Sequence, residues 1–451
     1  MHQPHLTPEL NLLEDQLRRF FVRLLLSPVP ISTAVPPGSD SRVLHSPERC
    51  IQYRHLAITA ADPLENPMSQ AVQLDQAEID LFRENVRKFM EKEIAPHYSQ
   101  WEKQEILPRE VWSKMGENGF LCVDVPEQYG GFGASFRLSA IVVEEASRAG
   151  FGGLASNLSV HSDIVAPYIL HLGTEEQKQK WLPKMVTGEA VGAIGMTEPG
   201  AGSDLQGMKT RAEKDGNDYV INGQKTFITN GQHCDVIVLA CKTDPNAGSK
   251  GITLFTVDTS LPGFARGRNL EKMGHHCADT SELFFENVRV GAEEILGGEG
   301  RGFANLMNEL PRERLILALG AVAACEGMLE RTVAYVQERK AFGVSVSQFQ
   351  NTRFKLAELQ AQIAVNRAFT TQCTNEYDEG KLSTVNASIA KLTTTELQGK
   401  VADECLQLFG GYGYMQEYPI SRDYVDARIQ RIYGGTSEIM KEIIARSVVG
   451  K

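Results

Sequence analysis

Two glutamates lie one helical turn apart in a segment whose apolar spacing predicts one long helix. Glu309 and Glu313 belong to residues 308–315 (NELPRERL), and Glu313 and Arg314 stand directly before an apolar seam that begins at Leu315. A carboxylate at the edge of an apolar cleft is poorly hydrated, which raises its pKa and suits it to act as a general base. A solvated face of charges is the alternative interpretation, and these residues alone leave both open.

A glycine-containing loop at residues 196–204 (MTEPGAGSD) could bind an anionic group. Its two glycines allow unusual backbone angles, so that successive N–H groups and the hydroxyls of Thr197 and Ser203 can surround a negative charge. A surface turn is the structural alternative, because Pro-Gly and Gly-Ser are common loop dipeptides.

Two further glycine segments follow near the C-terminus. Residues 407–414 (QLFGGYGY) end a predicted helix with three glycines and two tyrosines, and residues 432–439 (IYGGTSEI) lead into a final helix. A glycine C-cap accounts for one of the glycines, and Thr436 or Ser437 as N-cap accounts for the start of the last helix. Close approach of a ligand, and an anion at that helix start, are the functional interpretations.

Hydrophobic periodicity divides the rest of the chain into three blocks. The pattern is helical from residue 74 to about 188, has the period of strands from 191 to about 296, and is helical again after 302. This order excludes a doubly wound sheet, and no G-x-G-x-x-G follows a predicted strand, so a Rossmann dinucleotide site is not expected.

Within the middle block, Asn222-Gly223 lies between two alternating runs and predicts a β-hairpin turn there. Residues 236–240, 251–258 and 281–290 are predicted strands. In the following block the apolar seam of the long helix continues to Val336, and only Glu326 interrupts it. Helices are also predicted over residues 346–377 and 383–408.

Composition restricts the class of protein. A chain of 451 residues suggests about three domains. Lys+Arg 46 against Asp+Glu 57 gives a net charge of −11, which makes nucleic acid an improbable main partner, and no apolar run is long enough to span a membrane. The eight cysteines form no C-x-x-C pair, which favours free thiols in a reducing compartment, and no metal site is expected, since neighbours such as His275 and His276 point in different directions.

The first 67 residues differ from the remainder, since they hold nine of the 19 prolines, six arginines and no lysine. We interpret them as a poorly ordered leader or as sequence before a true start at Met68. A mitochondrial presequence is the alternative, although the segment carries seven acidic residues. The predicted domains are residues 68–190 (helical), 191–297 (β) and 298–451 (helical bundle).

Taken together, the motifs resemble the acyl-CoA dehydrogenase family over the chain from Leu74 to Lys451. The matching segments are residues 196–204 (MTEPGAGSD), 221–231 (INGQKTFITNG), 338–343 (ERKAFG), 407–414 and 432–439. The resemblance implies a mainly α fold with a central β domain, made of a helical bundle, a β-barrel-like domain and a C-terminal four-helix bundle. It also implies one FAD per subunit in a homotetramer that is a dimer of dimers.

One departure from the family pattern concerns the catalytic base. Many members carry a glutamate directly after the Tyr of the IYEGT-like motif, where this chain has Gly434. In the long-chain and isovaleryl branches the carboxylate comes from the long helix, at a position that matches Glu313. The resemblance, which is strongest to the long-chain branch, therefore implies that Glu313 is the base, with Glu309 as its rival.

The resemblance also implies roles for other residues. Arg314, Tyr433 and Gly434 would contact the acyl thioester, with the Gly434 N–H and a ribityl hydroxyl of the flavin stabilising the enolate oxygen. Ser203 would lie near the phosphates or the acyl-CoA. The residues implied to bind FAD are Met196, Thr197, Ser203, Phe227, Thr229, Arg339, Gln350, Gln407, Gly411, Thr436 and Glu438, of which Arg339, Gln350, Gln407 and Gly411 would reach the adenine half of a neighbouring subunit's FAD.

The implied activity is α,β-dehydrogenation of a saturated acyl-CoA to the trans-2-enoyl-CoA in fatty-acid β-oxidation, with electrons passing to an electron-transferring flavoprotein. A branched short-chain (isovaleryl-type) enzyme and a catalytically silent acyl-CoA-binding scaffold are the alternatives. The bacterial cytoplasm is the preferred location, and the mitochondrial matrix is the alternative if residues 1–67 are a transit peptide.

Overall fold

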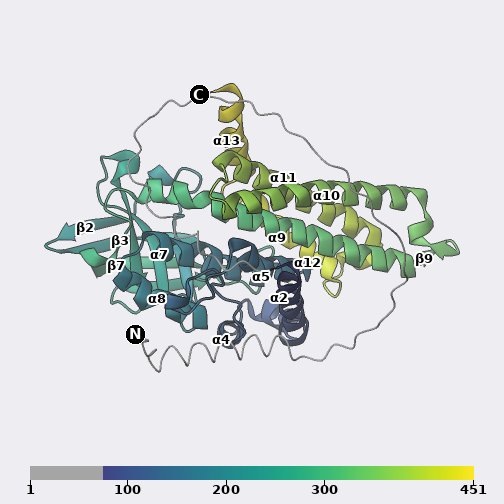
Figure 1. The fold of residues 1–451 in the computed structure, drawn as a ribbon, viewed down its shortest axis with the longest axis horizontal. Helices are drawn as coiled ribbons and strands as arrows, with labels where there is room; N and C mark the ends of the chain where they lie inside the picture. Colours follow the sequence, from purple (N-terminus) through teal and green to yellow (C-terminus); the bar gives the residue numbers. More distant parts are fainter. Residues whose placement is uncertain (1–74, 451) are drawn as a thin grey trace, which may run out of the picture. The chain divides into compact units, whose positions relative to one another are not determined.

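The computed structural model describes residues 75–450, so the interpretations of residues 1–67 lie outside the described part. Figure 1 shows the described chain as helices, then a sheet, then long helices. This arrangement confirms the predicted fold class of a mainly α protein with a central β domain. None of the helices in residues 75–450 is both long and apolar enough to cross a bilayer.

The first helical block is built from short segments with clear start signals. Asp75 caps α2 and Thr174 caps α8, each in a capping box with the residue three positions on. The elements are α2 (Gln76–Phe89), η2 (Met90–Ile94), α3 (Tyr98–Gln104), α4 (Arg109–Glu117), η3 (Glu127–Tyr129), α5 (Phe136–Arg148), α6 (Gly152–Leu158), η4 (Ser159–Val165), α7 (Ala166–Leu172) and α8 (Glu175–Thr187).

The sheet has the strand order β6-β7-β3-β2-β4-β5-β8, with β1 parallel to β4. Successive side chains of β4 enter two different cores, because strand neighbours point to opposite faces. Val236, Val238 and Ala240 join the core shared with the helices, whereas Ile237 and Leu239 join a core inside the β domain. The strands are β1 (Gly192–Gly195), β2 (Arg211–Asp215), β3 (Asp218–Thr229), β4 (Val236–Lys242), β5 (Ile252–Asp258), β6 (Phe264–Asn269), β7 (Thr280–Gly291) and β8 (Ile295–Leu296).

The predicted hairpin turn at Asn222-Gly223 is wrong. Strand β3 runs straight through these residues, and the turn lies earlier, between Asp215 and Asp218. Gly223 instead marks an irregularity in the pairing of β3 with β7. A Cβ at Gly223 would lie 2.4 Å from Oγ1 of Thr210, so a glycine is needed here for close strand packing. The Asn-Gly dipeptide therefore looks like a hairpin turn in the sequence although it lies within a strand.

The last block is dominated by α9 (Gly302–Glu338), a helix of 37 residues that runs through Pro311. At 1.5 Å per residue it is about 55 Å long. It packs against α5, α10 (Gln350–Asp378) and α11 (Thr384–Phe409). The remaining elements are β9 (Lys340–Ala341), β10 (Val344–Ser345), η8 (Val346–Gln348), η9 (Gly410–Tyr414), α12 (Pro419–Asp426), η10 (Ile429–Arg431) and α13 (Ser437–Val449).

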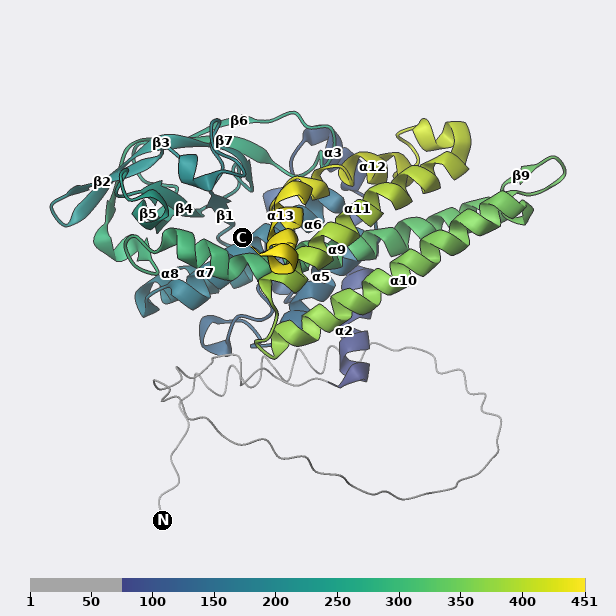
Figure 2. The same cartoon turned by 90° about the horizontal axis from the view of Figure 1, so that it is seen from above.

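Figure 2 shows that β9 lies at the end of α9 farthest from the sheet.

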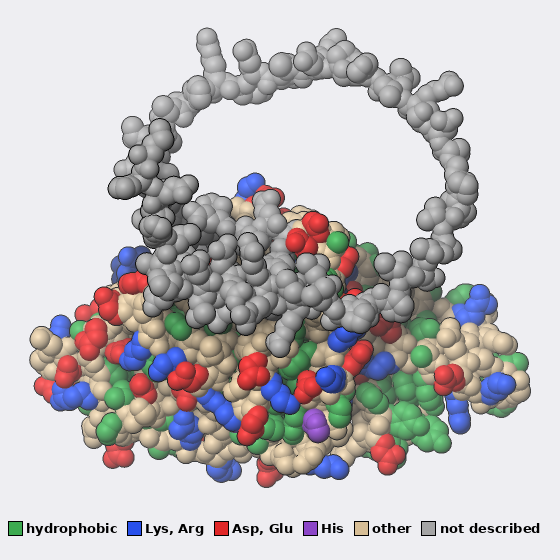
Figure 3. All heavy atoms as spheres, turned by 60° about the horizontal axis from the view of Figure 1, so that its bottom comes forward, with side chains coloured by type: hydrophobic (Ala, Val, Ile, Leu, Met, Phe, Trp, Pro, Cys, Tyr) green, Lys and Arg blue, Asp and Glu red, His purple; other side chains and the backbone are tan. Residues whose placement is uncertain are grey.

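All seven cysteines among residues 75–450 are free and buried, as predicted from their spacing. On the face shown in Figure 3, acidic and basic side chains are interspersed rather than gathered by sign.

Candidate active site

The buried carboxylate of Glu313 is the centre of the candidate site. Glu313 lies in the second quarter of α9 and is 3% exposed. The hydroxyl of Tyr168 in α7 donates a hydrogen bond of 2.7 Å to its Oε1 atom. Burial raises the pKa of Glu313 from 4.5 to about 7, Glu309 adds to the rise, and Tyr168 and Arg314 oppose it. A carboxylate with such a pKa is about half ionised at neutral pH, and its ionised form is basic enough to accept a proton.

Glu309, the rival base, has a different environment. It lies one turn before Glu313, is half-buried, and its two oxygens lie 3.0 and 3.1 Å from Nδ1 of His171. Tyr168 and His171 are one turn apart on α7, as the two glutamates are on α9, so two side-chain pairs join the helices. Tyr168 with Glu313 is the inner pair and is buried, whereas His171 with Glu309 is the outer pair and contacts solvent.

The loop at Gly434 and Gly435 packs onto the same part of α9. Both glycines have positive φ angles, of 62° and 97°. A Cβ at Gly434 would lie 2.4 Å from Cδ1 of Leu317, so Leu317 occupies the space that a larger residue at 434 would need. Lys391 of α11 donates a 2.6 Å hydrogen bond to the Gly435 carbonyl and holds the loop in place. The structure thus brings Gly434 close to the helical turn that follows Glu313.

Arg314 lies beside this loop. It is 4% exposed, its Nη1 donates to Oγ of Ser388 at 3.4 Å, and its Nε has no hydrogen-bond partner among the described residues. A Cβ at Gly435 would be 3.9 Å from its Nη2. Burial lowers the pKa of Arg314, and Glu313 and Tyr168 raise it. An unpartnered buried guanidinium N–H group suits the binding of an oxygen atom from a ligand.

Tyr433 extends the site toward α6. Burial raises the pKa of its phenol, and a hydrogen bond with Ser156 in α6 opposes that rise. Its ring centroid lies 6.4 Å from that of His275. The buried His275 donates its backbone N–H to the carboxylate of Asp426, and this hydrogen bond fixes the segment that packs beside Tyr433.

The residues implied to hold the flavin ring meet where β1 ends beside β3. The Thr226 N–H donates to the Thr197 carbonyl at 2.9 Å, and the buried Lys225 donates to the Met196 carbonyl at 3.1 Å and to Glu198 at 2.8 Å. Glu198 also accepts the backbone N–H groups of residues 209 and 210, which ties the 196–204 loop to the sheet.

Phe227, in the same strand, presents its ring outward. Its φ angle is +59° and it is 66% exposed. Positive φ in a bulky residue is unfavourable and is typical of functional positions. Thr229 follows at the end of β3 and is half-buried, whereas Ser203 is exposed on its loop. The structure therefore brings Met196 and Thr197 beside the part of β3 that carries Phe227 and Thr229, and Ser203 lies on the loop that follows Thr197.

A second set of predicted cofactor residues lies elsewhere. Arg339, Gln407 and Gly411 line a cavity of about 500 Å³ at the end of α9 and α11, where the Arg339 guanidinium lies 5.6 Å from the ring of Tyr412. Arg339 follows Glu313 by 26 residues, about 39 Å along the helix. Figures 1 and 2 show this end far from the sheet. One chain therefore does not bring this set to its own Glu313. Gln350 does not line the cavity but begins α10 nearby.

Thr436 and Glu438 stand at the start of α13. Of the two predicted N-cap candidates, Thr436 and Ser437, Thr436 is the N-cap, and its hydroxyl accepts the N–H of Ile439 at 3.3 Å. Glu438 is exposed in the first turn, and its pKa is lowered chiefly by a backbone hydrogen bond at the helix start.

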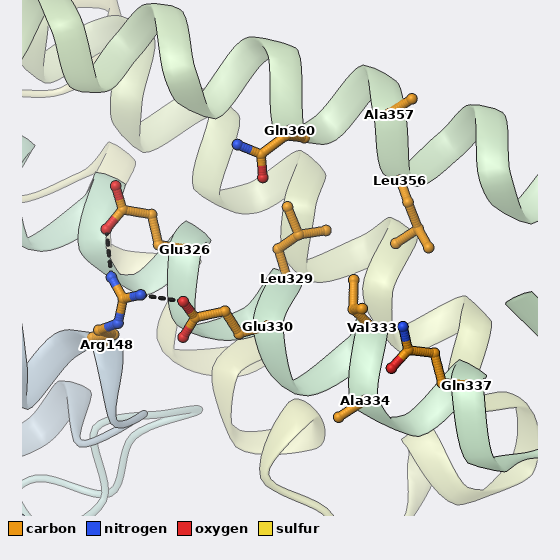
Figure 4. Close-up of a pocket in the computed structure, with 10 residues that line it drawn as sticks. All are labelled: Arg148, Glu326, Leu329, Glu330, Val333, Ala334, Gln337, Leu356, Ala357 and Gln360. Atoms are coloured by element: carbon orange, nitrogen blue, oxygen red, sulfur yellow. Dashed lines mark hydrogen bonds and ion pairs between the residues drawn. The ribbon is translucent and has the colours of Figure 1, made fainter. Parts of the chain in front are cut away.

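Glu326, which interrupted the predicted apolar seam, has a structural role. Its Oε2 lies 2.8 Å from Nη1 of Arg148 and its Oε1 lies 2.8 Å from Nε of Arg367. Figure 4 shows Arg148 joined to Glu326 and to Glu330 at one end of a cavity of about 830 Å³ between α9 and α10. These ion pairs neutralise the charge within the seam, and this cavity contains none of the predicted site residues.

Tyr168 and Lys391 contact the site but were missed by sequence reasoning. The segment around Tyr168, APYILHL, has the pattern of a buried helix, and nothing in that pattern identifies the partner of its hydroxyl. Lys391 lies in a run of small and polar residues in α11. Only the packing of α7 and α11 against α9 reveals their contacts.

Comparison with known proteins finds matches over most of the described residues. Three acyl-CoA dehydrogenase family models match: the N-terminal domain over residues 76–189, the middle domain over 193–288 and the C-terminal domain over 300–449. The chain is 50% identical over 375 residues to the mitochondrial long-chain specific acyl-CoA dehydrogenase of Mus musculus, which covers 83% of this chain and 87% of that protein. It is 38% identical over 369 residues to mitochondrial isovaleryl-CoA dehydrogenase of Solanum tuberosum, with 81% and 89% covered.

A solved structure, an acyl-CoA dehydrogenase from Geobacillus kaustophilus, is 52% identical and superimposes with a TM-score of 0.81, covering 84% of this chain and 100% of that one. The chain belongs to the acyl-CoA dehydrogenase family. It is an FAD-dependent enzyme that dehydrogenates acyl-CoA thioesters.

The described residues fit FAD at both predicted sets. A Cβ at Gly200, Gly202 or Gly411 would meet no atom within 4 Å, so the backbone is open to a ligand at these points. The hydroxyls and N–H groups of the 196–204 loop suit phosphate oxygens, and the outward ring of Phe227 suits a planar ring system. When bound, FAD supplies the two-electron acceptor for the β-hydrogen of the substrate.

Proposed function

We propose that Glu313 is the catalytic base and that the substrate is a long-chain acyl-CoA. The observation that carries the assignment is a carboxylate that is 3% exposed, has a pKa of about 7 and lies on the turn of α9 that packs against the Gly434 loop. Its neighbour Glu309 lacks this sequestration, because it is paired with His171 at the surface.

In this proposal Glu313 removes the α-hydrogen of the thioester as a proton. The α-carbon is far too weakly acidic for a free carboxylate, so negative charge on the thioester oxygen must be stabilised. The backbone N–H of Gly434 is the protein donor assigned to that oxygen, and it contributes about 3–4 kcal/mol by analogy with measured oxyanion holes. Arg314 places the thioester or the carboxylate, and Tyr433 forms a wall of the acyl pocket.

Anaerobic bleaching of the bound flavin tests the base. Glu313→Gln removes the proton acceptor while keeping the shape and the hydrogen bond from Tyr168. It should retain FAD and lose bleaching by palmitoyl-CoA. Glu309→Gln is the matched control one turn away and should still bleach. Bleaching at the wild-type rate in Glu313→Gln would refute the assignment.

The preference for long chains is supported by the 50% identity to a long-chain specific enzyme. An isovaleryl-type substrate is the second candidate, supported by the 38% identity to an isovaleryl-CoA dehydrogenase. Anaerobic bleaching rates measured from isovaleryl-CoA to palmitoyl-CoA distinguish them, because a maximum at isovaleryl-CoA would contradict the proposal. A silent scaffold would leave the flavin oxidised with every acyl-CoA.

We propose a homotetramer in which the adenine half of each FAD contacts a neighbouring subunit. The separation of about 39 Å between Glu313 and Arg339 supports this sharing. Large apolar side chains exposed on the last block, among them Phe342 (96%), Phe354 (59%) and Val365 (70%), supply surfaces for assembly. Light scattering should give the mass of four chains, and a monomer that retains FAD would contradict the proposal.

We further propose electron transfer to an electron-transferring flavoprotein, supported by a 36% identical match to a solved structure described as the electron transferring flavoprotein of Acidaminococcus fermentans. Location in the bacterial cytoplasm remains the proposal for the cell compartment, with the mitochondrial matrix as the alternative. Electron transfer to purified flavoprotein tests the first, and N-terminal sequencing of the mature protein tests whether residues 1–67 are removed.

A further inference from the structure

One hydrogen bond controls the carboxylate assigned as the base. The hydroxyl of Tyr168 lies 2.7 Å from Oε1 of Glu313, and both residues are buried. Among residues 75–450 neither side chain has another hydrogen-bond partner. Oε2 of Glu313 therefore has no protein partner in the described part, and it is the oxygen left to accept a proton.

We propose that Tyr168 is a positioning residue for the reaction: its hydroxyl orients the Glu313 carboxylate through Oε1, leaves Oε2 to receive the α-hydrogen as a proton, and favours the ionised form of the carboxylate between turnovers. This inference rests on the proposed role of Glu313. It assigns to α7, a helix without any of the predicted site residues, a direct influence on the chemistry.

The charged and titratable groups around Glu313 come from few elements. From α7, Tyr168 favours the ionised carboxylate by donating to it, and His171 is engaged with Glu309. From α9, Glu309 disfavours ionisation and Arg314 favours it. Desolvation remains the largest influence and disfavours ionisation.

The remaining charges nearby are engaged elsewhere. Arg312 on α9 is directed away from Glu313, to Asp124 and Asp163, and its guanidinium also donates to Tyr377. Lys391 on α11 is bonded to the Gly435 carbonyl. Tyr168 and Glu309 therefore affect the ionisation of Glu313 with opposite sign, and this opposition is testable.

Removing each group should move the pH dependence of flavin bleaching in opposite directions. Tyr168→Phe deletes the donor to the ionised form, so the midpoint should rise by about one pH unit and the rate at pH 6 should fall about tenfold. Glu309→Gln deletes a neighbouring negative charge, so the midpoint should fall below that of the wild type.

The experiment is anaerobic stopped-flow reduction of the FAD-loaded enzyme by palmitoyl-CoA from pH 5.5 to pH 9. Tyr129→Phe is the matched control, because its hydroxyl also donates to a glutamate, Glu175, at 2.9 Å but far along the chain from α9. It should keep the wild-type midpoint. FAD content and thermal melting show whether each variant is folded.

The outcomes separate the inference from the function on which it rests. A slower Tyr168→Phe enzyme with an unchanged midpoint would overturn the inference, because a packing role alone gives that result. If Tyr168→Phe fails to fold, an unchanged or raised midpoint in Glu309→Gln would overturn the electrostatic account. If Glu313→Gln bleaches normally, the proposed function itself fails, whatever the two midpoints show.

Discussion

Replacing Glu313, the proposed base, should stabilise the protein, and the gain in stability should grow with pH. In the folded chain burial raises the pKa of Glu313 from 4.5 to about 7. Between these two values the folded state keeps a proton that the unfolded chain has already released. The contribution of Glu313 to the stability of the folded state is therefore fully present below pH 4.5 and is lost as pH rises through about 7.

The magnitude follows from the two pKa values. At about 1.4 kcal/mol per unit, a rise from 4.5 to about 7 corresponds to about 3.5 kcal/mol of lost stability at alkaline pH. Roughly 2.5 kcal/mol of this develops between pH 5 and pH 8. Glu313→Gln resembles the protonated form at every pH, and its amide oxygen still accepts the Tyr168 hydroxyl.

Urea unfolding of both FAD-saturated proteins at pH 5 and pH 8 measures the effect. The stability of Glu313→Gln relative to the wild type should increase by about 2.5 kcal/mol between the two pH values. Other buried groups with raised pKa values, such as Asp163 and Asp426, are present in both proteins and cancel in the comparison. The exposed Glu175→Gln variant should show no such gain. An equal difference at both pH values would refute the raised pKa and the reasoning built on it.

Two further substitutions test the supports of the site. Gly434→Ala should slow flavin bleaching and lower the free energy of unfolding by about 1–2 kcal/mol, because φ is +62° and the new Cβ would lie 2.4 Å from Cδ1 of Leu317. Stopped-flow bleaching and urea unfolding measure the two effects. An unchanged bleaching rate would contradict the role of this loop. Glu198→Gln should destabilise the holoenzyme by about 3–5 kcal/mol, because it leaves the buried Lys225 ammonium without a counter-charge. A thermal melt equal to that of the wild type would contradict the role of this ion pair in holding the 196–204 loop.

Several features of the fold followed from local pattern. The seam from Leu315 to Val336 predicted the long helix, because apolar residues spaced alternately three and four positions apart lie on one face of an α-helix. The Asn222-Gly223 dipeptide was misleading, because a glycine needed for close packing against Thr210 has the same sequence as a hairpin turn. Glu326 could not be interpreted from its own helix, because its partners come from α5 and α10.

The sequence by itself determined the residue types available for chemistry: a carboxylate at the start of an apolar seam, a glycine where many relatives carry the base, and three glycine-rich segments. The tertiary structure decided which of two glutamates is sequestered, because burial and the Tyr168 hydroxyl come from α7, some 145 residues away along the chain. It also placed the two sets of predicted cofactor residues apart, one beside β1 and β3 and the other at the end of α9 and α11. Distances along the chain do not fix which side chains exclude water from one another, and the pKa of a base depends on that exclusion.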